Sequence, residues 1–294
     1  MLQALGFFAL LEAAGLAAAP LAGLLFARLP GAGLGFAKPL GVLLVGWLAW
    51  MAASLRVVHY GRWTIVGAFA VVAVAGALVA ARQRGLERRL AEAGEGAGGG
   101  PLRRWRRARL AARALPAEDP SRRGLLLGAE AVFAVVYAAT ALVVSYAPDV
   151  WNTEKPMDMA FVDAIGVSRS FPPHDPWMAG EPLNYYYLGH LVLSLPAQVL
   201  GLEPSVGYNL ALAALAGLSA AAVFTLAGSV WAAARVRARG GPVGAGLAAV
   251  ALCLVLGNLA GAKAWLDAKR PPHDYDWFAP SRVIKDTINE IPSF

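Results

Sequence analysis

Side chains that could do acid–base chemistry gather in a short stretch near the middle of the chain. It reads Asp149-Val-Trp-Asn-Thr-Glu-Lys-Pro-Met-Asp158, which places the carboxylates Glu154 and Asp158 beside the ammonium group of Lys155. Such a carboxylate can take a proton from a hydroxyl group, and the cation can neutralise an anionic leaving group. Pro156 suits the first position of a helix, where a first-turn carboxylate is also stabilised by the helix dipole. The spacing therefore leaves Asp158 open to two interpretations, a catalytic base and a helix-stabilising charge.

A second polar stretch, residues 273–290, contains the Asp-x-Asp pair Asp274 and Asp276. Acidic pairs of this kind resemble those that hold a divalent cation together with sugar or phosphate groups, because hard cations prefer oxygen ligands. Asp-x-Asp pairs are also frequent by chance in loops. Arg282 and Lys285 follow the pair, and each can contact a phosphate or an ordinary lipid headgroup. A divalent cation is the one cofactor that these residues suggest.

A third stretch, Glu181-Pro-Leu-Asn-Tyr-Tyr-Tyr-Leu-Gly-His190, leads into the apolar segment Tyr185–Leu200. At about 1.5 Å per residue this segment is roughly 24 Å long, which is shorter than the hydrocarbon core of a bilayer. Its apolar residues share one helical face, and the polar residues share the other face: Tyr186, Tyr187, His190, Ser194 and Gln198. We therefore expect a helix that lies in the membrane interface and offers this polar face to a substrate.

The composition indicates what must position these residues. The chain has 294 residues, of which 58% are hydrophobic and 15% charged, and its mean hydropathy is +0.53. These values are typical of an integral membrane protein. The net charge of +7 does not indicate nucleic-acid binding, because twelve of the 26 lysines and arginines lie between Arg82 and Arg123, as in a cytoplasmic loop beside a membrane. The only cysteine, Cys253, excludes an internal disulfide framework.

Six apolar runs are long enough to cross a bilayer. In lipid only helices and closed barrels satisfy all backbone hydrogen-bonding groups, and because these runs lack the alternation of strands, we expect helices. The sequence therefore predicts an all-α, polytopic helical membrane protein with about six spanning helices and an interfacial (juxtamembrane) helix at 185–200. The predicted spans are Leu2–Phe26, Pro39–Leu55, Trp63–Ala81, Gly124–Tyr146, Val206–Trp231 and Val243–Leu266.

The arginine-rich loop sets the expected topology. If residues 82–123 form a basic cytoplasmic linker, residues 148–184 and 267–294 lie in external loops on the same face of the membrane. A solvated loop is the simpler interpretation of this linker, and an interfacial helix over Pro101–Leu115 is the alternative. The chain then divides into a three-helix segment at 1–81, the linker at 82–123 and a membrane module at 124–294.

Three classes of function fit this arrangement. An enzyme would use the clustered external acids, whereas a transporter or lipid-handling protein would carry acids near the bilayer midplane between discontinuous helices. Nearly all acids of this chain fall in predicted loops, which favours the enzyme; Glu12, near the middle of a predicted span, has no partner evident in the sequence. A non-enzymatic scaffold, whose motifs serve packing, is the third class.

Several motifs resemble those of one family of uncharacterised archaeal and Chloroflexi-type membrane proteins that carry a YYY motif. The resemblance rests on residues 153–158 (TEKPMD), residues 172–177 (PPHDPW) with 184–190 (NYYYLGH), and residues 281–284 (SRVI) with 287–290 (TINE). Asn152 stands where the family has glycine. Because family members continue beyond this point, the chain looks like the N-terminal part of a longer protein.

That family in turn resembles the GT-C class of membrane glycosyltransferases, which use polyprenyl-phosphate-linked sugars. The resemblance implies a GT-C-like topology, transfer of a sugar to an acceptor at the external membrane face, and contacts with membrane lipids. It makes Glu154 or Asp158 the base that activates the acceptor, and it makes Lys155 or Arg282 the partner of the departing phosphate. The substrate-binding residues are then Lys155, Asn184, Tyr185, Tyr186, Tyr187, His190 and Arg282.

Overall fold

The computed structural model describes residues 1–27, 29–92, 120–146, 148–150, 154–234 and 241–256. Within these ranges the chain is mostly helical, and the only strand-like pairing is an isolated bridge between His174 and Pro182. Five helices in this described part of the chain are long and apolar enough to cross a membrane. The prediction of an all-α, multi-pass membrane protein is confirmed.

The helices follow the predicted spans closely. In chain order they are α1 (Leu2–Leu25), the 3-10 helix η1 (Pro30–Phe36), α2 (Ala37–Ser54), α3 (Arg62–Glu92), α5 (Pro120–Tyr146), α6 (Lys155–Val167), α7 (Leu188–Leu200), α8 (Pro204–Ala233), α9 (Gly241–Val250) and the π-helix η2 (Ala251–Val255). The short apolar helix that begins at Gly241 corresponds to the first half of the sixth predicted span, whose remainder lies outside the described residues.

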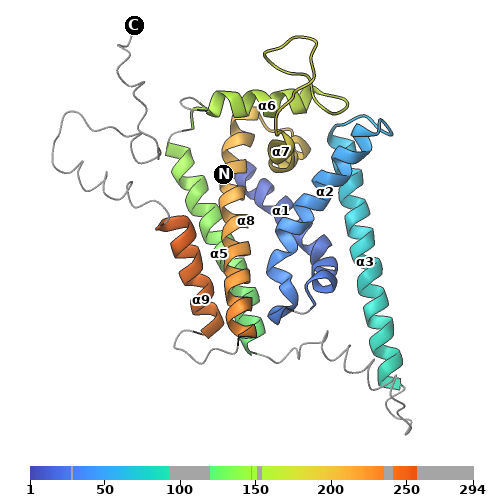
Figure 1. Cartoon of the computed structure of the whole chain (residues 1–294), viewed down its shortest axis with the longest axis vertical. Helices are drawn as coiled ribbons and strands as arrows, with labels where there is room; N and C mark the ends of the chain where they lie inside the picture. The colour runs from blue at the N-terminus through green and yellow to red at the C-terminus, as the bar shows by residue number, and fades with distance from the viewer. Residues whose placement is uncertain (28, 93–119, 147, 151–153, 235–240, 257–294) are drawn as a thin grey trace, which may run out of the picture.

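The long helices run side by side, and α6 lies across one end of the bundle (Figure 1). The helix α7 is seen nearly end-on just below α6, so it also runs across the bundle. We call this end of the molecule the α6 end. The C-terminal part of α3 and the first residues of α5, which flank the arginine-rich segment, lie at the opposite end. The structure thus separates the two regions that the arginine pattern assigned to opposite membrane faces.

The helix α7 differs from its prediction in two respects. It begins at Leu188, so the three tyrosines precede the helix instead of forming its first turn. It is also enclosed by other helices, because Leu191 and Leu195 are buried against the core and Ser194 on the expected polar face is buried as well. A left-handed Gly201 ends the helix, with the N–H of Leu202 donating to the carbonyl of Ala197. The short helix still crosses the α6 end of the bundle, as expected for an interfacial helix, and one of its faces is covered by other helices.

Three charged side chains of the spanning helices form an ion cluster, a pairing that the sequence did not indicate. Nζ of Lys38, in the first turn of α2, lies 3.2 Å from Oε2 of Glu12 on α1 and donates a hydrogen bond to Glu130 on α5. The Lys38 side chain is 7% exposed and sits 4.7 Å from the centre of the Phe133 ring. Glu130 lies roughly 15 Å along α5 from Pro120, at about 1.5 Å per residue. We call Lys38, Glu12 and Glu130 the internal ion cluster.

Small residues let these helices approach closely. A side chain at Gly41 of α2 would collide with the carbonyl oxygen of Ala14 on α1, and one at Gly76 of α3 would collide with that of Ala17. Close backbone contact of this kind is how helices associate in lipid, where burial of apolar side chains provides little driving force. The helix α1 is thus clamped between α2 and α3.

The membrane orientation can be tested with single cysteines. In a Cys253→Ser background, we expect Glu181→Cys, at the α6 end, to react with an impermeant maleimide added to intact cells. Arg84→Cys, at the other end, should react only after the membrane is permeabilised, because arginine-rich segments stay in the cytoplasm. Labelling of Arg84→Cys in intact cells would show that the protein has the opposite orientation in the membrane.

Candidate functional site

Asp158 lies in the first turn of α6, where the helix crosses the α6 end. Pro156 occupies one of the first two helical positions, and the backbone N–H of Asp158 donates to the carbonyl of Glu154. The side chain is 28% exposed, so it is partly enclosed and still accessible. The local sequence explains the placement, because proline and a carboxylate both favour a helix start.

Two long-range partners hold the Asp158 carboxylate. Nε2 of His190, on the first turn of α7, lies 3.1 Å from Oδ1. The hydroxyl of Tyr208, on α8, donates to Oδ2 across 3.1 Å. Among the described residues each carboxylate oxygen thus has one hydrogen-bond partner, which leaves it a lone pair for a further donor. This arrangement fixes the orientation of the carboxylate and leaves it able to accept a proton from a bound hydroxyl group.

His190 completes a three-helix cluster of Asp158, His190 and Tyr208, which we call the Asp158 cluster. With Nε2–H donating to the carboxylate, the neutral ring presents Nδ1 as an acceptor. Among the described residues this buried Nδ1 has no hydrogen-bond partner. Asp158 thus fixes the orientation of the His190 ring through Nε2.

A cavity of about 140 Å³ adjoins the Asp158 cluster. Asp158, His190, Ser194 and Tyr208 provide its polar walls. The remaining walls are small or apolar and come from α6, α7 and α8: Val162, Leu193, Gly207, Ala211, Leu212 and Leu215. A cavity with polar groups on part of its wall and hydrocarbon on the rest suits an amphipathic ligand.

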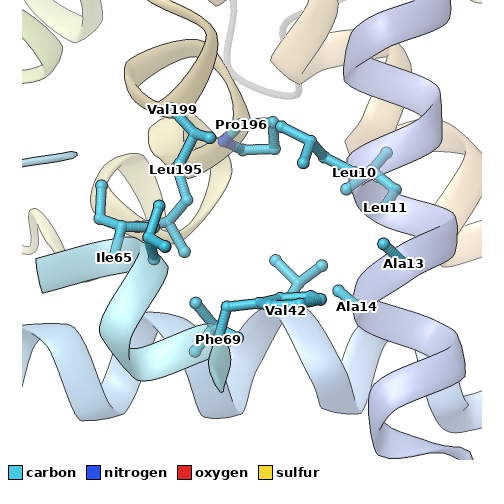
Figure 2. Close-up of a pocket in the computed structure, with 12 residues that line it drawn as sticks. Leu10, Leu11, Ala13, Ala14, Val42, Ile65, Phe69, Leu195, Pro196 and Val199 are labelled. Carbon is cyan, nitrogen blue, oxygen red and sulfur yellow. The ribbon is translucent and has the colours of Figure 1, made fainter. Parts of the chain in front are cut away.

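A larger cavity, of about 280 Å³, lies on the other side of α7 (Figure 2). Leu195, Pro196 and Val199 of α7 face residues of α1, α2 and α3 across it, including Leu11, Val42 and Phe69. Every lining side chain is apolar. This cavity is suited to a hydrocarbon chain and contains no group that could activate a polar substrate.

An aromatic cluster borders the Asp158 cluster. The buried ring of Phe161, one turn after Asp158, lies 5.5 Å from His190, 5.3 Å from Tyr185 and 5.5 Å from Trp177 between ring centres. Tyr185 stacks on Tyr186 at 4.0 Å, and their hydroxyls are hydrogen-bonded at 2.6 Å. That hydrogen bond is the main cause of a raised pKa for Tyr185, with contributions from desolvation and nearby negative charges. The single O–H of Tyr185 is donated to Tyr186, so the Tyr186 hydroxyl keeps its own O–H for another partner.

The other predicted site residues are spread more widely. Glu154 and Asn184 are exposed, and Lys155 is half-buried at the start of α6. The Tyr187 ring stacks on Phe171, and its hydroxyl accepts a hydrogen bond from Nε1 of Trp50 on α2. Tyr187 therefore ties the loop to α2, while Tyr185 and Tyr186 border the Asp158 cluster. Asp274, Asp276 and Arg282 lie outside the described residues, so the expected divalent cation stays a prediction.

Tyr208 was missed by sequence reasoning. It is buried near the start of α8, and its neighbour Asn209 donates to the carbonyl of Pro148 at the end of α5. The one available signal was a Tyr-Asn pair at the start of an otherwise apolar helix, next to the predicted external face. Polar residues at that depth need partners, and here the partners come from distant segments.

Comparison with known proteins identifies a family for this chain. A family model described as "Uncharacterized membrane protein (DUF2298)" matches residues 44–294. That description includes neither the GT-C class nor a YYY motif. No curated protein and no solved structure matches the chain.

Proposed function

The chain belongs to the DUF2298 family of uncharacterized membrane proteins, and we propose its function from the geometry of the Asp158 cluster. The proposed reaction is the transfer of a sugar from a polyprenyl-phosphate donor to an acceptor hydroxyl at the outer membrane face. One observation carries this proposal. A carboxylate oriented by His190 and Tyr208 lines a cavity whose remaining walls are apolar, at the end of a membrane-spanning bundle.

In the proposed reaction, Asp158 is the general base. As the acceptor oxygen attacks the anomeric carbon, its proton passes to the free lone pair of Asp158. The bond between the anomeric carbon and the phosphate oxygen breaks, and polyprenyl phosphate leaves with that electron pair. This single displacement inverts the anomeric centre, as in other inverting reactions that use one carboxylate base.

Asp158 is favoured over Glu154 as the base, since Asp158 has two oriented partners while Glu154 is exposed at the start of α6. Lys155 is assigned to the leaving phosphate. It lies at the N-terminus of α6, where backbone N–H groups also favour an anion. The apolar walls of the cavity beside the Asp158 cluster would hold the first part of the polyprenyl chain.

Transport or lipid handling is the second candidate, and the internal ion cluster favours it. Its lysine is buried, its two glutamates are 30% and 52% exposed, and all three lie on the spanning helices α1, α2 and α5. Ionisable groups on spanning helices are often part of a transport pathway. The sequence argument that acids lie almost entirely in loops is weaker for this reason.

The direct test is a transfer assay on protein reconstituted in nanodiscs. A polyprenyl-phosphate donor with a labelled sugar is supplied together with a hydroxyl acceptor, and the labelled product and the released polyprenyl phosphate are measured. We expect the labelled product and polyprenyl phosphate to appear in equal amounts. Movement of donor or ions across proteoliposome membranes without product formation would support the transporter instead.

Tyr208→Phe is expected to lower kcat about ten- to a hundredfold, since it removes one hydrogen bond to a charged group that orients the base. The KM for acceptor should change little, because Tyr208 acts through Asp158. Tyr146→Phe, at the exposed end of α5, is the matched control and should leave kcat unchanged. An equal loss in both variants would contradict the positioning role of Tyr208.

A further inference from the structure

Three large aromatic side chains lie exposed on the α6 end, beside the Asp158 cluster. Trp177 is 60% exposed, Tyr186 is 75% exposed and Tyr185 is 41% exposed. All three connect to Phe161: Trp177 and Tyr185 contact its ring, and Tyr186 stacks on Tyr185. Phe161 in turn contacts His190. We call Trp177, Tyr185 and Tyr186 the aromatic platform.

The loop that carries the platform is rigidly built. Oδ1 of Asp175 accepts hydrogen bonds from the backbone N–H groups of Trp177 and Met178, at 2.8 and 3.0 Å. The N–H of Asp175 donates to the carbonyl of Glu181, and the N–H of Leu183 donates to the carbonyl of Pro173. Exposed rings fixed in this way lose little conformational entropy when a ligand stacks on them.

The charges around the platform favour a neutral ligand over the anchoring of the protein among phosphate headgroups. Asp175 supports Trp177, and the carboxylates of Glu154 and Asp158 act on Tyr185. Residues 148–184 contain six acids and two bases, and one of these bases, Lys155, is assigned to the phosphate of the donor. Carboxylates and tyrosine hydroxyls are suitable partners for the hydroxyl groups of a neutral sugar.

We propose that the aromatic platform binds the acceptor of the transfer reaction, and that this acceptor is a neutral saccharide. The C–H face of a sugar ring would stack on Trp177 and the Tyr185–Tyr186 pair, while its hydroxyls meet the surrounding carboxylates. Phe161 links the platform to His190, so a saccharide held there extends toward Asp158. The acceptor role rests on the proposed glycosyl transfer, but saccharide binding does not.

Binding can be measured without any donor. For protein in nanodiscs, we expect saturation-transfer NMR to detect maltotetraose or mannotetraose but not glycerol 1-phosphate. Trp177→Ala should weaken saccharide binding about tenfold, the size of one aromatic stacking contact. Trp63→Ala is the matched control, because Trp63 is 80% exposed at the start of α3 on the same end of the bundle. It should leave saccharide binding unchanged.

Three results would overturn the platform proposal: no binding of either saccharide, equal binding by the Trp177→Ala variant, or preferential binding of glycerol 1-phosphate. Brominated lipids give a further check, because a headgroup anchor would be quenched by them. The fluorescence of Trp177 is the difference between the wild type and the Trp177→Phe variant, and we expect brominated lipid not to quench it. If brominated lipid quenches Trp177 as strongly as Trp63, measured in the same way with Trp63→Phe, Trp177 is a membrane anchor. Saccharide binding without any transfer would refute the proposed reaction and leave the binding site standing.

Discussion

Replacing Asp158 with Asn is expected to lower the rate of sugar transfer by about 10²- to 10⁴-fold, the usual contribution of a general base. The amide cannot take the proton of the acceptor hydroxyl, yet it has nearly the shape of the carboxylate. Its oxygen can accept the hydrogen bond from His190, and its NH2 group can donate to the Tyr208 oxygen, which reverses the direction of that bond. The variant should therefore fold normally and bind the saccharide acceptor. The measurement is initial rate at saturating donor, together with thermal stability in the same nanodiscs.

Two neighbouring carboxylates provide matched controls for Asp158. Asp163→Asn changes an exposed acid on the same helix, and Glu154→Gln changes the other acid that the sequence identified as a possible base. Both variants should retain most of the activity. If Glu154→Gln is inactive and Asp158→Asn is active, the roles of the two acids are reversed. Full activity in both Glu154→Gln and Asp158→Asn would remove the general base from the proposed mechanism.

Replacing Lys38 with Met is expected to destabilise the protein by about 1–3 kcal/mol, because Lys38 is buried while the Glu12 and Glu130 carboxylates that lose their cation are 30% and 52% exposed. Methionine has a similar length, so the packing of the side-chain stem against Gly15 is retained. The carboxylates of Glu12 and Glu130 would then lose the cation that they share. The free energy of unfolding can be measured by denaturant titration in mixed micelles.

The triple variant Lys38→Met, Glu12→Gln, Glu130→Gln separates charge from packing. It removes all three charges at once, and buried ion clusters replaced by neutral groups often lose little stability. We expect it to recover most of the stability lost in the single variant. A triple variant as unstable as Lys38→Met would show that packing of Lys38, and not the uncompensated charge, is responsible.

The helices themselves were predictable because each signal is local. A run of about 20 apolar residues has to cross lipid as a helix, and the proline before Asp158 starts α6 wherever that helix packs. The clustering of arginines likewise indicated which ends of the helices share a side of the bundle. The start of α7 was placed three residues too early, because the tyrosines are amphipathic and fit an interfacial helix as well as a loop.

The partners of the functional side chains came only from the tertiary structure. Asp158 meets His190 and Tyr208, which are 32 and 50 residues away, and Lys38 meets Glu130, which is 92 residues away. Spanning helices are apolar on every side, so their composition does not indicate which faces will pack together. In lipid that choice depends on close backbone contact at small residues and on polar pairing, which arise between segments distant in sequence. The sequence therefore determined that this is a helical membrane protein with an acidic, aromatic loop region, while the packing of the helices decided that Asp158 has oriented partners and that Glu12 is paired.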